Sequence, residues 1–131
     1  MHKILLITGA FFGAAAVALG AFAAHGLKKI VPEETVLTFQ TGVQYQMYHA
    51  LALLLTGILS EKYSSKFTGY AGWLFIFGIL FFSGSLYLLT WLQVTGTAGL
   101  NKIGLITPLG GVFFIAGWVC LFISVLRKKR S

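Results

Sequence analysis

Four uncharged stretches, separated by short charged segments, limit what this chain can fold into. Each stretch is about 20 residues long, the length of an α-helix that crosses a bilayer core of about 30 Å. The pattern therefore predicts an all-α integral membrane protein, a bundle of four transmembrane helices that forms a single domain over residues 1–131. We place the spans at residues 4–24, 39–59, 70–93 and 108–126.

The composition excludes a soluble domain. Of the 131 residues, 57% are hydrophobic and 10% are charged, and the mean hydropathy is +0.86. A soluble domain of this length has too little interior to bury so much apolar surface. The net charge of +7 does not indicate nucleic-acid binding, because four basic residues form the terminal run Arg127 to Arg130. We expect that run to lie among anionic headgroups of the lipid bilayer, where each charge contributes about 1 kcal/mol.

The first stretch has some features of a signal peptide. Lys3 gives it a basic start, and Ala21 and Ala23 have the spacing of a cleavage site. Its apolar run of about 21 residues is longer than the apolar region of a signal peptide, which has about 7–15 residues. We therefore expect an uncleaved span.

The basic residues predict which side of the membrane each end of the chain occupies. With four spans, both termini share a side with the loop at residues 60–69. Cytoplasmic segments are enriched in Lys and Arg, so the more basic side, and with it both termini, is predicted to be cytoplasmic. That side carries seven such residues, namely Lys3, Lys62, Lys66 and the terminal run, and the other side carries three, Lys28, Lys29 and Lys102.

Two prolines mark predicted helix starts. Pro32 suits a first helical position, and Glu33 and Glu34 would then occupy the first turn, near the positive end of the helix dipole. An unbroken helix from Pro32 would exceed the hydrocarbon thickness, so we expect an interfacial first part, a tilt or a bend. Before the last span, Thr107 is expected to cap a helix that begins at Pro108.

Small residues in the first span recur every three or four positions. This spacing places them on one side of a helix, where a neighbouring backbone can approach closely. The sequence therefore predicts a helix-packing face. Its members are Gly9, Gly13, Ala16, Gly20 and Ala24.

Polar residues in the second and third spans also share helix faces. At 100° per residue, Gln46 and His49 fall on one side of the second span with Gly42 and Tyr45, opposite the leucines. These groups can form hydrogen bonds between helices, or they can line a path or site for a substrate. We expect the following residues to face the bundle interior: Tyr45, Gln46, His49, Ser83 and Tyr87.

Several residue types are missing from the spans. The chain has no Asp, and its three Glu lie in loops, so no span offers a carboxylate for ion coupling or a catalytic dyad. His25 and His49 differ in depth by about 15 Å, which disfavours a shared metal or haem, and Ser83 has no evident base partner. The single cysteine, Cys120, excludes an intrachain disulfide. We expect no cofactor.

Four blocks of sequence carry a family resemblance. "GAFAAHGL", "TGVQYQMYHALALL", "FFSGSLYLL" and "ITPLGGVFFIAGW" occur in that order and cover all four spans. Together they resemble the YgdD/YwdK-like small bacterial membrane proteins, a family of unknown function that is similar to vertebrate transmembrane protein two-five-six. The family commonly reads GAFGAH where this chain reads GAFAAH, so Ala23 replaces the second glycine of the motif. The resemblance implies a multi-pass protein of the bacterial plasma membrane and assigns no reaction, substrate or cofactor.

The sequence favours two functions over a third, an enzyme or haem carrier. The first is a non-enzymatic helix bundle that acts through contacts with lipid and with protein, either further copies of itself or another membrane protein. The alternative is a small-solute channel or binding protein that uses the polar face around Gln46 and His49.

Overall fold

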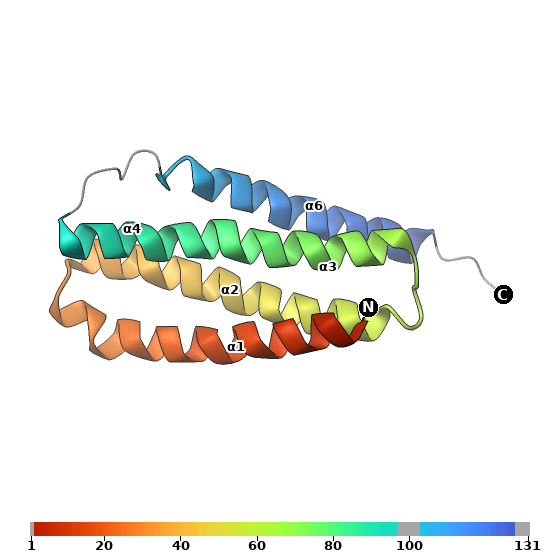
Figure 1. Cartoon of the computed structure of the whole chain (residues 1–131), viewed down its shortest axis with the longest axis horizontal. Helices are drawn as coiled ribbons and strands as arrows, with labels where there is room; N and C mark the ends of the chain where they lie inside the picture. The colour runs from red at the N-terminus through yellow and green to blue at the C-terminus, as the bar shows by residue number, and fades with distance from the viewer. Residues whose placement is uncertain (1, 97–102, 128–131) are drawn as a thin grey trace.

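The computed structural model describes residues 2–96 and 103–127, and its regular elements over those residues are all helical. Four rods run side by side (Figure 1). The third rod is continuous and has a π-helical segment, η2, between two α-helical parts, α3 and α4. The elements are α1 (His2–His25), η1 (Leu27–Lys29), α2 (Glu33–Leu59), α3 (Lys66–Gly78), η2 (Ile79–Ser83), α4 (Gly84–Thr95) and α6 (Ile106–Leu126).

The rods pack in a definite order. Helix α1 packs along α2, α2 packs against α3, η2 and α4, and α6 packs against α3 and η2. Helix α2 and the third rod therefore occupy the middle of the bundle, with α1 and α6 on the outside. The start of α1, the turn between α2 and α3 and the end of α6 all lie at one end (Figure 1).

Three of the described helical segments are long and apolar enough to cross a membrane: His2–Lys29, Lys66–Thr95 and Ile106–Leu126. They contain the first, third and fourth predicted spans. Helix α2 contains the remaining one and is 27 residues long, but its hydropathy is lowered by Gln40, Gln44, Gln46 and His49. The all-helical prediction is confirmed, and the crossing by α2 stays a prediction.

The helix starts differ from the sequence prediction at both prolines. Pro32 is the N-cap of α2, in an extended conformation, so the helix begins at Glu33 and then runs unbroken through Gly42. Helix α6 begins at Ile106, so the predicted Thr107 cap is wrong. Pro108 instead lies in the first turn, where backbone N–H groups have no partner within the helix and its missing N–H costs little.

Hydroxyl groups join α3 to the end of α6. The Ser65 hydroxyl caps α3 by accepting from the backbone N–H of Thr68 at 3.4 Å. The Thr68 hydroxyl is hydrogen-bonded to that of Ser124 on α6, and Ser124 also donates to the carbonyl of Tyr63 at 3.0 Å. These bonds fix the α2–α3 turn against α6.

Two apolar clusters fill the interior. The larger one joins all four rods and includes Leu5, Leu53, Phe75 and Phe114. The smaller one, near η1, includes Leu27 and lies at the opposite end of the bundle from the α2–α3 turn. Between the two clusters lie the polar residues of α2.

The π-helical segment lies at a close contact between α6 and the third rod. A Cβ at Gly110 of α6 would be 2.7 Å from the Cα of Phe82, which belongs to η2. Single π-helical turns within α-helices are rare and often occur at functional sites. Here the segment coincides with this close backbone approach of α6 to the third rod.

Candidate functional site

Gln46 connects three helices. Its side chain, only 3% exposed, projects from the middle of α2. The amide nitrogen donates to the carbonyl of Phe12 on α1 at 2.9 Å, and the amide oxygen accepts from the Tyr87 hydroxyl on α4 at 2.7 Å. Both ends of the amide are thus bonded to neighbouring helices.

A second contact lies one turn away on α2. The buried Ser83 hydroxyl donates to the carbonyl of Gly42 at 2.6 Å. A side chain at Gly42 would obstruct this approach, because a Cβ there would be 3.0 Å from the Tyr87 ring. The Tyr87 ring also packs against Phe39, with centroids 4.9 Å apart. Gly42 therefore allows the third rod to come close enough for both hydrogen bonds.

His49 connects α2 to α6. Its Nδ1 lies 2.8 Å from the carbonyl of Tyr45, and its Nε2 lies 3.0 Å from the indole nitrogen of Trp118. A carbonyl can only accept and an indole N–H can only donate. These partners assign a neutral imidazole that donates from Nδ1 and accepts at Nε2. Both ring nitrogens are then occupied.

Aromatic rings surround the His49 imidazole. The Phe114 ring lies parallel to it, with centroids 3.6 Å apart and an interplanar angle of 6°. Phe75 and Trp118 approach it at 5.5 and 5.9 Å. His49 is 5% exposed, so its polar atoms are sealed within an apolar contact between three helices.

The buried polar groups of the inner face have hydrogen-bond partners within the bundle. Over the described residues, every buried side-chain nitrogen or oxygen has a hydrogen-bond partner, and the groups of the inner face are neutral. Leaving such groups unbonded in hydrocarbon is costly. The arrangement can hold helices at fixed separations. Across the same residues, no group of three His, Cys, Asp or Glu side chains is placed to hold a metal ion.

The structure brings together most of the residues that we selected from the sequence. Gln46, His49 and Ser83 are buried, and Tyr87 is partly buried. Tyr45 lies at the edge of the face and is 39% exposed, because at 100° per residue it lies about 60° around the helix from Gly42, on the side away from Gln46. Its ring packs against Phe82 at 4.7 Å.

The small-residue face of α1 turns toward α2. Gly9 is the tight position, since a Cβ there would be 2.9 Å from the carbonyl oxygen of Ala50. Gly13 and Gly20 have more room, with the nearest atoms at 4.0 and 3.4 Å from a built Cβ. Ala24, predicted for the same face, is exposed.

Sequence reasoning missed the contribution of α6. Trp118, which donates to His49, reads as one more apolar residue in a long apolar stretch. Gly110 and Gly117 accommodate Phe82 and Phe75 of the third rod. Their spacing of seven, two helical turns, is the signal that could have identified this second packing face.

Comparisons with known proteins show which family the chain belongs to. Residues 19–111 match the family described as "Protein of unknown function (DUF423)". The chain is similar to the UPF0382 membrane protein YwdK of Bacillus subtilis, with 43% identity over 126 residues, or 95% of this chain and 98% of the relative. A UPF0382 membrane protein of Staphylococcus epidermidis is 44% identical over 125 residues, which cover 95% of this chain and 97% of that protein.

No solved structure matches the chain significantly. The matched region runs from the last turns of α1 to the beginning of α6 and includes Gln46, His49, Ser83, Tyr87 and Gly110. Similarity to the two relatives extends over nearly the whole of each protein. The chain therefore belongs to the DUF423 family of membrane proteins.

Proposed function

We propose that this chain is a non-enzymatic, four-span helix bundle of the bacterial plasma membrane that acts through contacts with lipid and with other membrane proteins. The observation that carries the proposal is that the buried polar atoms of the inner face are bonded to neighbouring helices or to the backbone. The two ends of the Gln46 amide are hydrogen-bonded to α1 and α4, and the two ring nitrogens of His49 are hydrogen-bonded to Tyr45 and Trp118. Each polar side-chain atom of this pair therefore already has a partner within the bundle, which supports a structural role over solute binding or proton transfer.

The same hydrogen bonds support a membrane crossing by α2. Polar side chains are tolerated within hydrocarbon when they are turned inward and bonded. Gln46 and His49, which lower the hydropathy of α2, meet that condition. Four crossings also agree with Figure 1, in which the start of α1 and the end of α6 lie at the same end of the bundle. Of the basic residues in the orientation count, Lys102 and the residues 128–130 lie outside the described residues.

Contacts with a partner would use the outer helices. Large apolar side chains on α1 and α6 face outward, among them Phe11, Val17, Ile115 and Phe122, each more than 60% exposed. In a membrane these faces meet lipid, a second copy of the chain or another membrane protein. They are the surfaces through which we propose that the bundle acts.

Thiol labelling tests the proposal against the alternative of a solute path. In a Cys120→Ala background, Ser83→Cys replaces the buried hydroxyl with a thiol of similar size. We expect a membrane-impermeant maleimide to leave it unlabelled in intact membranes, because the position is 0% exposed and sealed by its contacts.

Two control positions make that result interpretable. Ser64→Cys, on the exposed α2–α3 turn, should label readily from one side. Leu51→Cys, 56% exposed on the outer side of α2, should stay unlabelled if it faces lipid. Rapid labelling of Ser83→Cys would show a water path to the inner face and would replace the proposal by the channel alternative.

A further inference from the structure

Two cationic side chains converge on one aromatic ring at the end of the bundle. Lys66, at the start of α3, places its ammonium 5.7 Å from the centroid of the Phe67 ring. Arg127, directly after α6, places its guanidinium 5.5 Å from the same centroid. The two residues are far apart in the sequence, and the packing of α6 on α3 brings them together.

Among the residues that the structure describes, neither of these cations is paired with an acidic side chain. An ion pair at the same end of the bundle joins His2 to Glu61 at 3.6 Å, and it involves neither Lys66 nor Arg127. Each cation has a favourable contact with the ring. Two like charges near one ring nevertheless repel each other, and this repulsion would be relieved by an anion bound between them.

A cavity of about 410 Å³ lies beside the ring. Its lining contains Lys66 and Arg127 and no acidic residue. Ser64 also lines it, and over the described residues its hydroxyl has no hydrogen-bond partner, which leaves it available as a donor. The neighbouring Ser65 hydroxyl already accepts from Thr68 and donates to Ser124.

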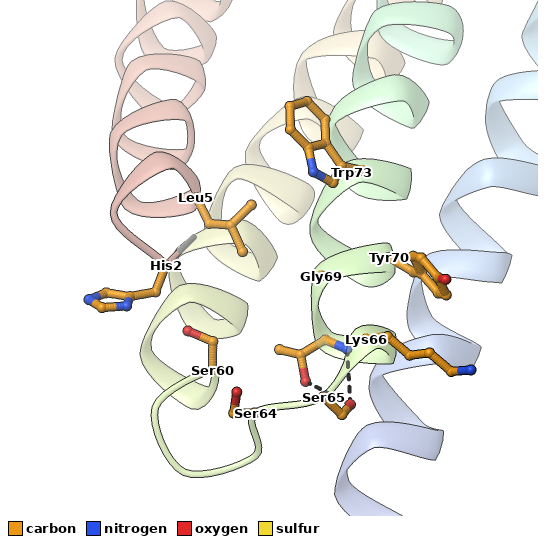
Figure 2. Close-up of a pocket in the computed structure, with 10 residues that line it drawn as sticks. His2, Leu5, Ser60, Ser64, Ser65, Lys66, Gly69, Tyr70 and Trp73 are labelled. Atoms are coloured by element: carbon orange, nitrogen blue, oxygen red, sulfur yellow. Dashed lines mark hydrogen bonds between the residues drawn. The ribbon is translucent and has the colours of Figure 1, made fainter.

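A larger cavity, of about 520 Å³, lies on the other side of the α3 start. Figure 2 shows Leu5 and Trp73 in its upper part, with Ser60 and Ser64 near the turn below. The Lys66 side chain extends away from Leu5 and toward α6, the blue helix. Lys66 lines both cavities, but its ammonium lies on the α6 side, beside Phe67 and the smaller cavity.

We propose that the Lys66–Arg127 cavity binds the phosphate of one anionic phospholipid. Lys66 and Arg127 would neutralise the headgroup, with the Ser64 hydroxyl as a further donor. The location favours a lipid over a free anion, because α3 and α6 end here and the headgroup layer lies at the ends of transmembrane helices. Basic pockets between transmembrane helices are a common form of headgroup site.

Native mass spectrometry of the detergent-solubilised protein tests this site. The full chain is titrated with phosphatidylglycerol or with phosphatidylcholine of the same acyl chains. We expect one phosphatidylglycerol to bind more tightly than phosphatidylcholine. The variant Lys66→Gln/Arg127→Gln should weaken phosphatidylglycerol binding about 25-fold, roughly fivefold for each charge.

A matched variant distinguishes binding at the Lys66–Arg127 cavity from general electrostatic attraction of the lipid to basic residues. Lys28→Gln/Lys29→Gln removes the same charge at the other end of the bundle and should leave the affinity unchanged. Phe67→Leu keeps both charges but removes the ring that holds them, and it should weaken binding about threefold. All three replace exposed or partly exposed side chains, and circular dichroism checks that their helix content is unchanged.

Three results would overturn the proposal. The two lipids could bind equally, the two double variants could lose affinity equally, or excess inorganic phosphate could displace the lipid. The last result would assign the cavity to free phosphate. The proposal requires only that the protein lies in a membrane, so its failure would leave the thiol-labelling result, and the function it tests, unaffected.

Discussion

At the scale of single residues, Gln46 and His49 are bonded to different neighbours of α2. Gln46 reaches α1 and α4, whereas His49 reaches α6 through Trp118. Hydrogen bonds between helices in a membrane contribute about 0.6–2 kcal/mol each. Two adjacent turns of α2 therefore attach it to all the other rods.

A double-mutant cycle measures the His49–Trp118 bond. His49→Leu leaves the indole N–H without its acceptor, and Trp118→Phe leaves Nε2 without its donor. Each should lower the free energy of unfolding by about 1–2 kcal/mol. The double variant should cost less than the sum by about 0.6–1.7 kcal/mol, because the second substitution has no bond left to break.

The cycle is measured by denaturation with dodecyl sulphate in mixed micelles, followed by circular dichroism. His25→Leu serves as a control, since His25 lies exposed at the end of α1 and should change stability little. If the losses of unfolding free energy in the two single variants add up to the loss in the double variant, the two side chains do not stabilise each other.

The sequence indicates the direction of these side chains but not their partners. The periodicity of α2 was enough to place Gln46 and His49 on one face, opposite Leu51. Which helix meets that face depends on how the rods pack and rotate, and the sequence pattern of one helix does not contain that information. For this reason Trp118 could not be selected from the sequence: its indole N–H has a hydrogen-bonding role only because the packing of α6 places it opposite His49.

At the scale of the elements, glycines set the distance between helices. Gly9 lets α1 approach the backbone of α2, and Gly110 lets α6 approach η2. The small-residue pattern of α1 was readable because it repeats through the helix. The π-helical segment was not, since its residues Ile79–Ser83 are apolar and small types that also suit an α-helix.

Alanine substitutions at Gly9 and Gly13 of α1 should change the free energy of unfolding differently, because only Gly9 is tightly packed. In Gly9→Ala, the new Cβ would lie 2.9 Å from the Ala50 carbonyl oxygen and 3.0 Å from Leu54 Cγ. We expect a loss of about 1–3 kcal/mol in unfolding free energy. Gly13→Ala has its nearest neighbour at 4.0 Å and should be neutral or stabilising by up to about 1 kcal/mol. Equal effects would mean that α1 is not held against α2 as the structure has it.

Adjacent glycines in α6 allow a closer comparison. In Gly110→Ala, the new Cβ would meet the backbone of Phe82, 2.7 Å from its Cα. Backbone cannot rotate aside as a side chain can, so we expect a loss of about 2–3 kcal/mol. Gly111→Ala, whose nearest neighbour is Phe82 Cδ2 at 4.0 Å, should change stability little. Thermal unfolding in detergent measures both, and a smaller loss for Gly110→Ala than for Gly111→Ala would contradict the packing of α6.

At the scale of the whole molecule, the two ends of the bundle differ in charge. The end formed by the start of α1, the α2–α3 turn and the end of α6 carries Lys3, Lys62, Lys66 and Arg127. The opposite end carries Lys28 and Lys29 in η1. The more basic end should face the cytoplasm, which also places the proposed lipid site in the cytoplasmic leaflet.

Reporter fusions test the orientation and the crossing by α2 together. With four crossings, fusions after Lys62 and after Ser131 should both report the cytoplasm, by fluorescence of a green fluorescent protein, whereas a fusion after Lys102 should report the exterior, by alkaline phosphatase activity. If α2 instead lay flat on the outer surface, only three helices would cross and all three reporters would exchange sides. The position after Lys62 is the most direct of these, since it follows α2 immediately. We expect a cytoplasmic signal there, because Gln46 and His49, on two adjacent turns in the middle of α2, bond it to α1, α4 and α6, and a helix held between membrane-crossing neighbours must cross with them.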